Sequence, residues 1–387
     1  MGYLTLNQSC PMLSTRLLFS TLTLIVLAAG SGCVGDDEVF TPVVPILDPD
    51  QACDESTLVR GWAGSSVAHG GTVLGMDATD ASFGVAVGTG GDWWLTDDAG
   101  ESWTARRLTV DGSVAGDLGA VCFPTRETGY VLPAEQAATP YFYQTTDGGT
   151  NWTKQAQPDL AELTTLHFFD AARGLAIGRP TAIAEQRLLR TTDGGRTWTI
   201  VQDPVVRTLR SAFFDGPDGS LVIDGTDADN NGALFALFAD GNYQQWTHPS
   251  SSFLSHLSAL PDGTLRARFD VVNNASFFFG GLRFVSTDGG DSWLSTDVFQ
   301  QNAAATAGHW RTATDGFYLI HTRNLQGTTG QVNTVDGAPY EVEQFSGGTQ
   351  ERRPQPPACA FEGPAVSFGT EVFVQARAAN FLRLAYE

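Results

Sequence analysis

The chain has 387 residues, of which 42% are hydrophobic and 11% aromatic, so it can bury a large core. Its formal net charge at pH 7 is -21, and its 22 basic residues include a single lysine, Lys154. A chain this acidic repels the phosphates of nucleic acids and anionic lipid headgroups, so we expect no nucleic acid partner.

The first 32 residues have the pattern of an export signal. Arg16 precedes the apolar run 17–27, and small residues follow up to Cys33. This apolar stretch is shorter than the roughly 20 residues that a membrane-spanning helix needs, which favours a signal peptide. The ending AAGSGC resembles a bacterial lipobox, in which the cysteine becomes the lipidated first residue. Gly30 stands where lipoboxes usually carry leucine, so ordinary signal peptidase cleavage is the alternative.

We therefore expect an exported protein of a bacterial cell envelope. A lipid on Cys33 would anchor it to the membrane, in the periplasm or on the outer surface. Residues 33–56 combine prolines and acidic side chains without hydrophobic periodicity, and they are predicted to be a tether. The predicted folded domain covers residues 57–387.

An acidic, glycine-containing phrase recurs four times in this domain. It reads TDDAGESW at 96–103, TTDGGTNW at 145–152, TTDGGRTW at 191–198 and STDGGDSW at 286–293. The four aspartates are separated by 49, 46 and 95 positions, and the doubled last gap predicts a degenerate copy midway. DGNYQQW, from Asp240 to Trp246, lies there. One further step reaches Asp336 in TVDGAPY, where Tyr340 stands near the place of the tryptophan.

A repeat of this length is typical of a β-propeller, in which each repeat forms one four-stranded blade. Residues 163–201 fit this pattern, because LTTLHFF, LAIG, RLLRT and WTIV are strand-like segments separated by turns. In the repeat around Asp336, the strand-like segments in the same order are GFYLIHTR, QVNT and YEVEQF. The predicted fold class is all-β.

The number of blades follows from the two ends of the domain. Six acidic turns account for six blades, and residues 365–387 then supply three more strands. TLVRGWAG at 57–64 has no acidic turn of its own and can supply the missing outer strand, which leaves no free sheet edge. The sequence predicts seven blades with a composite seventh, and six blades with an irregular tail is the alternative.

Cysteine positions agree with export and with this closure. Beyond the signal region the cysteines are Cys53, Cys122 and Cys359. None forms a CxxC pair or lies at metal-ligand spacing from a histidine, so no zinc site is expected. Cys53 precedes the predicted closing strand and Cys359 precedes the first strand of the same blade. They are therefore candidates for one disulfide, with Cys122 as a competing partner.

The repeated turns resemble the Asp box, or BNR repeat, of sialidases, sortilin-type receptors and several glycoside hydrolases. The whole repeat, best preserved from Leu163 to Trp198, is most similar to the photosystem II assembly and stability propellers. This resemblance implies that the turns lie on the outer margin of the ring and act as scaffold. The structural residues that it assigns are Asp98, Trp103, Asp147, Trp152, Asp193, Trp198, Asp240, Trp246, Asp288 and Trp293.

No catalytic residue is assigned. A sialidase would carry an R-I-P motif near its start, and the nearest string, GRPT at 178–181, lies in the middle of the domain. His167 is expected in a strand core, whereas His309 and His321 could line a ring face but are also read as structural. The sequence favours a non-catalytic interaction or assembly scaffold with an envelope protein or glycan as partner. The alternatives are a glycan-active hydrolase and a glycan- or peptide-binding receptor.

One loop has the composition of a cation site. Residues 227–232 read DADNNG, in which Asp227, Asp229 and Asn231 would offer side-chain oxygens. Calcium is therefore the one candidate cofactor, and an ordinary polar turn is the alternative reading.

Overall fold

The structure is a computed structural model of the whole chain. It describes residues 51–202, 204, 206–209, 213–247, 252–273, 278–300, 303–322, 340–361, 363–377 and 379–387, with two short paired strands, β1 (Phe19–Ser20) and β2 (Thr23–Leu24). The chain divides into two units, Met1–Leu47 and Asp48–Glu387. Arg16, Gly30 and the lipobox Cys33 of the predicted signal lie outside the described residues. In the described part, no helix is long and apolar enough to span a membrane.

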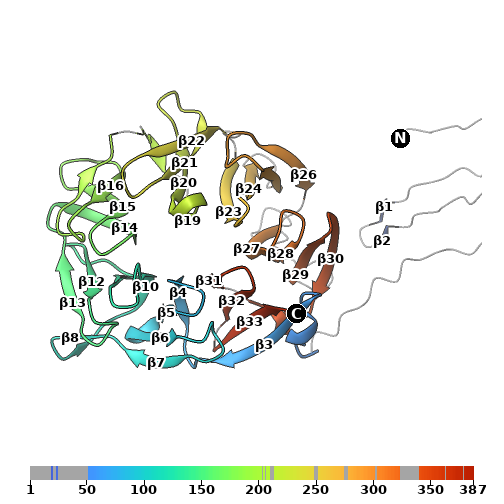
Figure 1. The fold of residues 1–387 in the computed structure, drawn as a ribbon, viewed down its shortest axis with the longest axis horizontal. Coiled ribbons are helices and arrows are strands. Elements are labelled where there is room, and N and C mark those ends of the chain that lie inside the picture. The colour runs from blue at the N-terminus through green and yellow to red at the C-terminus, as the bar shows by residue number, and fades with distance from the viewer. Residues whose placement is uncertain are drawn as a thin grey trace, which may run out of the picture. The chain divides into compact units, whose positions relative to one another are not determined.

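The second unit is a seven-bladed β-propeller, as the repeat predicts (Figure 1). Blade 1 consists of β4 (Val73–Ala78), β5 (Gly84–Gly88), β6 (Asp92–Thr96) and β7 (Thr104–Arg107). Blade 2 consists of β10 (Leu118–Cys122), β11 (Gly129–Pro133), β12 (Tyr141–Thr145) and β13 (Thr153–Ala156). Blade 3 consists of β14 (Leu160–Phe168), β15 (Gly174–Pro180), β16 (Arg187–Thr191) and β17 (Thr199–Ile200). A small hairpin, β8 (Thr109–Val110) and β9 (Ser113–Val114), lies between blades 1 and 2.

The remaining blades have the same order of strands. Blade 4 consists of β18 (Thr208–Leu209) with β19 (Phe214–Asp215), β20 (Leu221–Thr226), β21 (Gly232–Leu237) and β22 (Tyr243–Thr247), and blade 5 of β23 (Ser252–Ala259), β24 (Leu265–Asn273), β25 (Phe278–Ser286) and β26 (Leu294–Gln300). Blade 6 consists of β27 (Ala303–Trp310), β28 (Gly316–Thr322), β29 (Tyr340–Ser346) and β30 (Thr349–Gln355). Blade 7 consists of β31 (Ala365–Phe368), β32 (Val372–Arg377), β33 (Asn380–Tyr386) and β3 (Trp62–Ala68). Short 3-10 turns are η1 (Glu55–Thr57), η2 (Thr89–Gly91), η3 (Pro217–Gly219) and η4 (Pro357–Cys359).

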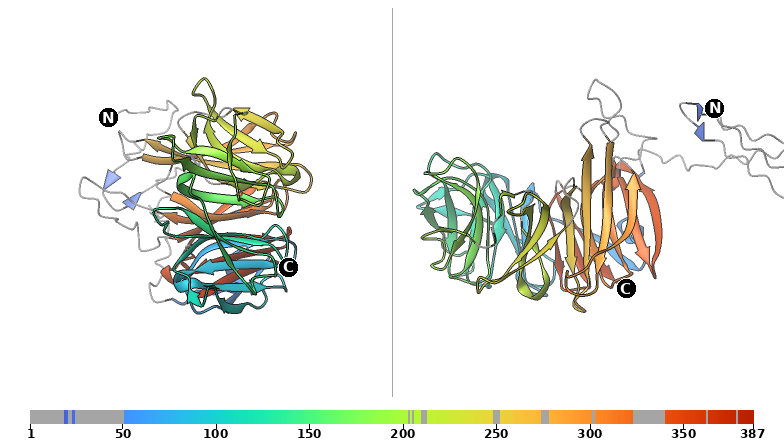
Figure 2. Two further views of the ribbon diagram at one scale, coloured as in Figure 1. Left: turned by 90° about the vertical axis from the view of Figure 1, so that its left-hand side faces the viewer. Right: turned by 90° about the horizontal axis from the view of Figure 1, so that it is seen from above.

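The core lies in the seams between blades. Every residue of the second strands β5, β11 and β20 is buried, because a neighbouring blade covers each face of these sheets. Side views show the sheets standing face to face around the ring (Figure 2). The innermost strands of the blades therefore enclose the axis, and the turns emerge on the two faces.

The seventh blade is composite, as predicted. β3 pairs antiparallel with β33 from Trp62 opposite Tyr386 to Ala68 opposite Asn380. The N-terminal strand thus becomes the outer strand of the last blade and covers an edge that would otherwise be free. The strand begins at Trp62, so only the last part of the predicted segment 57–64 belongs to it.

The prediction for blade 6 was wrong in register. Asp336 lies outside the described residues, and 340–346 is the third strand rather than the fourth, since β29 pairs with both β28 and β30. The turn before the fourth strand is formed at Gly347 and Gly348. Residues 323–339 lengthen the connection between the second and third strands, so a constant repeat length places the turn too early.

Candidate functional site

The acidic turns are closed by hydrogen bonds of their own side chains. Asp98 Oδ1 accepts from the Thr96 hydroxyl at 2.7 Å and from the Ser102 N–H at 2.9 Å, and Oδ2 accepts from the Ser102 hydroxyl at 2.6 Å. The same contacts recur around Asp193 and Asp288, and around Asp147 with the Asn151 side-chain amide in place of the second hydroxyl. Bonds from Ser292 lower the pKa of Asp288 to about 2. These carboxylates are engaged within their turns.

The second glycine of each turn faces the preceding blade. At Gly149, φ is 80°, and an added Cβ would lie 2.4 Å from the ring of Trp93 in blade 1. The tryptophan after the turn, Trp152, meets the same ring edge-on with centroids 5.8 Å apart. At Gly290 an added Cβ would lie 2.0 Å from Trp246 of blade 4. The turns are therefore joints between blades.

The other predicted turn residues occupy comparable places. Trp103 stacks on Phe381 at 4.3 Å, and Trp198 meets Phe168 edge-on at 6.0 Å. Trp293 contacts Trp246 edge-on at 5.8 Å. The degenerate turn lies between the third and fourth strands of blade 4, but Asp240 there accepts both the backbone and side-chain N–H groups of Asn242.

The innermost strands enclose an axial cavity of about 600 Å³. Its ionisable lining residues are Asp77 on β4, His167 on β14, Asp215 on β19, His256 on β23 and His309 on β27. No arginine or lysine is among the described residues that line it. A concave site with a few polar groups is the usual form of a binding site, so this axial cavity is the candidate functional site.

Burial sets the protonation of the cavity groups. Burial raises the pKa of Asp77 to about 7; the Phe123 N–H, which donates to Asp77 Oδ2 at 2.6 Å, opposes this shift, and the charge of Asp215 adds to it. Burial also lowers the pKa of His256 to about 3 and lowers the pKa of His167 and of His309. The histidines are thus uncharged at neutral pH, and the carboxyl groups determine the charge of the described lining.

The sequence analysis missed Asp77, Asp215 and His256. A signal for two of them exists, because Asp77, His167 and Asp215 each stand three residues before the aspartate that begins the first turn of their blade. If the blades are aligned on that first turn instead of the acidic turn, these three residues fall at equivalent positions of their blades. His256 stands outside this alignment.

The two predicted ring-face histidines have structural contacts. His309 is 5% exposed, and its ring nitrogens lie 2.8 Å from the Ser367 hydroxyl oxygen and 3.2 Å from the Thr370 carbonyl oxygen. The ring of His321 stacks on Tyr340 with centroids 4.9 Å apart. His309 therefore contributes a wall of the cavity, and its nitrogens are used in holding blade 7.

The loop proposed for calcium is closed by Asp227. Its Oδ1 accepts from the N–H groups of Asp229 and Asn231, both at 2.9 Å, and Arg207 Nε donates to the Ala228 carbonyl at 2.7 Å. Within the described ranges, no group of three or more His, Cys, Asp or Glu side chains could hold a metal ion. Calcium binding at this loop stays a prediction.

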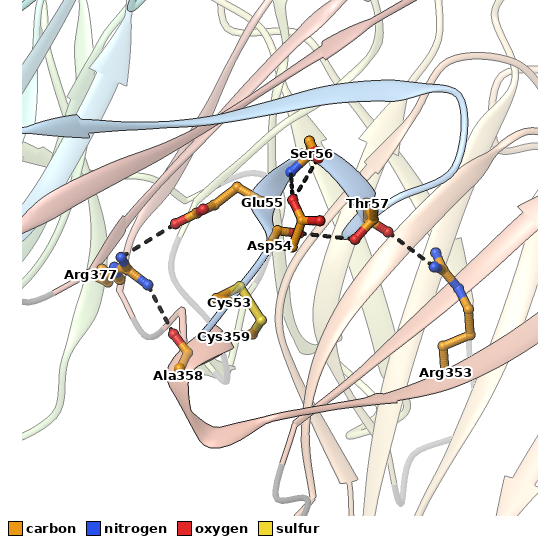
Figure 3. The surroundings of a disulfide bond; sticks show 9 residues. All are labelled: Cys53, Asp54, Glu55, Ser56, Thr57, Arg353, Ala358, Cys359 and Arg377. Carbon is orange, nitrogen blue, oxygen red and sulfur yellow. Dashed lines mark hydrogen bonds and ion pairs between the residues drawn. A yellow bond between two sulfur atoms is a disulfide. The ribbon is translucent and has the colours of Figure 1, made fainter. Parts of the chain in front are cut away.

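The cysteines are placed as follows. Cys53 and Cys359 form a disulfide between Cα atoms 4.9 Å apart (Figure 3). Cys122 is buried and free, and its Sγ accepts the N–H of Phe168 in the next blade at 3.3 Å. Asp77 of blade 1 accepts the N–H of Phe123 in the same way. Residues 51–56, at the end of the predicted tether, therefore carry part of this bridge and the start of η1.

Several solved structures share this fold. YCF48 bound to a D1 peptide is 18% identical, with a TM-score of 0.55, and the match covers 87% of this chain and 99% of that chain. YCF48 from Cyanidioschyzon merolae is 12% identical with the same TM-score, covering 84% and 98%. The GH74 xyloglucanase from Xanthomonas campestris is 13% identical with a TM-score of 0.52, covering 83% of this chain and 53% of the enzyme.

This chain thus spans about half of the xyloglucanase and nearly all of YCF48. No protein-family model and no curated protein sequence matches it. At these identities the likeness shows the fold, and the chain is a β-propeller that resembles YCF48 in architecture.

Proposed function

We propose that this protein is a non-catalytic interaction scaffold that receives a basic side chain of a partner protein in its axial cavity. The observation that carries the proposal is the cavity itself, with Asp77 and Asp215 in its wall and no arginine or lysine among its described lining. A bound cation would stabilise the ionised form of both carboxyl groups. The YCF48 structure with a D1 peptide supports peptide binding by a propeller of this fold.

The second part of the proposal concerns location. Export to the envelope and a lipid on Cys33 would hold the propeller at a membrane surface, where an assembly factor meets its partner. The support for this part is the apolar run followed by AAGSGC in the sequence.

A crosslinking experiment tests the scaffold function. Membranes that contain the full chain are crosslinked, and the captured partner is identified and compared between the wild type and the Asp77→Asn/Asp215→Asn variant. We expect the double variant to lose the partner and Asp291→Asn, an exposed carboxylate in an acidic turn, to keep it. Equal capture by all three chains would contradict the assignment to the cavity.

A second candidate is glycoside hydrolysis, which the protonation of Asp77 favours. A carboxyl group with a pKa of about 7 beside a second carboxyl group is the arrangement that a general acid needs. Incubation of the protein with a library of oligosaccharides separates the candidates. Turnover that is lost in Asp77→Asn would assign an enzyme, whereas intact oligosaccharides together with a captured partner support the scaffold.

A further inference from the structure

Residues 51–61 form a strap along the seam between blades 6 and 7. Leu58 is 2% exposed and Val59 is 1% exposed, and both belong to the apolar cluster that contains Phe317 of blade 6 and Phe373 of blade 7. An added Cβ at Gly64 of β3 would lie 1.7 Å from the Glu55 carbonyl oxygen, so the strap lies directly on the outer strand. The strap thus fills a groove of the ring.

One end of the strap is held through its backbone. Gln344 accepts from the Arg60 N–H at 3.0 Å and donates to the Arg60 carbonyl at 2.7 Å. Arg353 donates to the carbonyls of Thr57 at 3.2 Å and Leu58 at 2.9 Å. Backbone contacts combined with apolar anchors are the way in which grooves bind peptides, and here the bound peptide belongs to the same chain.

The other end is held by the Cys53–Cys359 disulfide, with Arg377 beside it (Figure 3). Arg377 donates to the Ala358 carbonyl at 2.9 Å and to Glu55 at 3.5 Å, so its guanidinium contacts the residue before Cys359 and the second residue after Cys53. Cys359 is 6% exposed, whereas Cys53 is half-buried. Cys53 is thus the more exposed of the two cysteines, and we take its sulfur as the one attacked and that of Cys359 as the leaving group.

Closure of the ring does not depend on the strap. The pairing of β3 with β33 extends over seven residue pairs, from Trp62 to Ala68, all of them after the strap. Detachment of residues 51–61 leaves this ladder intact.

We propose that the disulfide is a thiol-controlled latch that decides whether the strap stays in its groove. A thiolate of a dithiol reductant attacks Cys53 Sγ, and Cys359 leaves as a thiolate beside the positive charge of Arg377. The second thiol of the reductant attacks the mixed disulfide and releases Cys53. The reductant becomes a disulfide and the two cysteines gain its two electrons. The freed strap then leaves the seam between blades 6 and 7.

Hydrogen exchange of the full chain under native conditions tests the latch, with dithiothreitol as the reductant. We expect reduction to speed exchange of the strap amides at least about tenfold, which corresponds to roughly 1.4 kcal/mol of lost protection, while the β33 amides stay protected. Cys53→Ser should show the same exchange without reductant, and Cys122→Ser should behave like the wild type. A strap that stays protected after reduction, or β33 losing protection with it, would overturn the proposal.

The role of Arg377 has its own readout, the rate of reduction. Arg377→Gln should slow reduction by about three- to tenfold, because the leaving thiolate loses a neighbouring cation. Arg383→Gln, which changes an arginine of the same blade that pairs with Glu101, is the matched control. Equal rates for the wild type and Arg377→Gln would remove Arg377 from the latch.

Discussion

Aspartates with different surroundings have different tasks in this protein. Asp288 accepts hydrogen bonds within its turn, and its pKa falls to about 2. Asp77 lies in the axial cavity near Asp215, and its pKa rises to about 7. The first remains ionised and closes a turn, whereas the second changes its charge near neutral pH. The turn aspartates stand out in the sequence because they are repeated, whereas Asp77 does not stand out, although its charge changes near neutral pH.

The titration of Asp77 predicts a dependence of stability on pH. Because its pKa is higher in the folded chain, Asp77 binds more protons there than in the unfolded chain between roughly pH 4 and pH 7. Its contribution to the free energy of unfolding therefore falls as the pH rises through this window. Asp77→Asn keeps an acceptor for the Phe123 N–H and removes the titration.

We expect the Tm of Asp77→Asn to equal that of the wild type near pH 4 and to exceed it at pH 8. Thermal melts at several pH values measure this difference, and Asp291→Asn controls for the loss of one negative charge. A difference in Tm that is the same at every pH would show that Asp77 has an ordinary pKa.

The tryptophans of the acidic turns should contribute to stability rather than to binding. Trp152 is 7% exposed and packs on Trp93 across a seam, so Trp152→Ala should cost about 3 to 5 kcal/mol of the free energy of unfolding. Leu294→Ala, at a side chain that is 69% exposed, should cost little. Denaturant unfolding measures both values. A Trp152→Ala variant with normal stability and lost partner capture would reassign the turn to binding.

Some strands and turns of the fold could be predicted from the sequence and others could not. The acidic turns were predictable, because their repeated glycines and tryptophans mark the same local geometry in several blades. The composite blade was predictable, because the strands left over at the two ends of the domain complete one another. The register of blade 6 was not predictable, since residues 323–339 make this repeat longer before its third strand. The strap was also missed, because Leu58 and Val59 become core residues only once blades 6 and 7 stand beside them.

Two truncations separate the strap from the closing strand. A chain that begins at Arg60 lacks the disulfide, Leu58 and Val59, and its Tm should fall moderately. A chain that begins at His69 also lacks β3 and exposes the edge of β33, so it should fail to melt cooperatively. Calorimetry distinguishes the two outcomes. A chain without β3 that is as stable as the wild type would contradict closure of the ring by that strand.

At the scale of the whole molecule, the described strands of the propeller enclose an axial cavity, and the predicted anchor would hold the propeller at a membrane. Cys33→Ser should move the protein from the detergent phase to the aqueous phase, because it removes the residue that would carry the lipids. Phase partitioning of the two chains measures this. A wild-type protein that is already in the aqueous phase would show that Cys33 is not lipidated.

The measurement that tests the central claim most directly is site-specific photo-crosslinking of a partner in membranes. A photoreactive residue is placed at Ser258 in the cavity wall or at Leu294 on the outside of blade 5. Binding in the axial cavity predicts a specific partner crosslinked from Ser258, with a basic residue near the crosslinked position, and none from Leu294. A partner crosslinked from Leu294 and not from Ser258 would contradict the account.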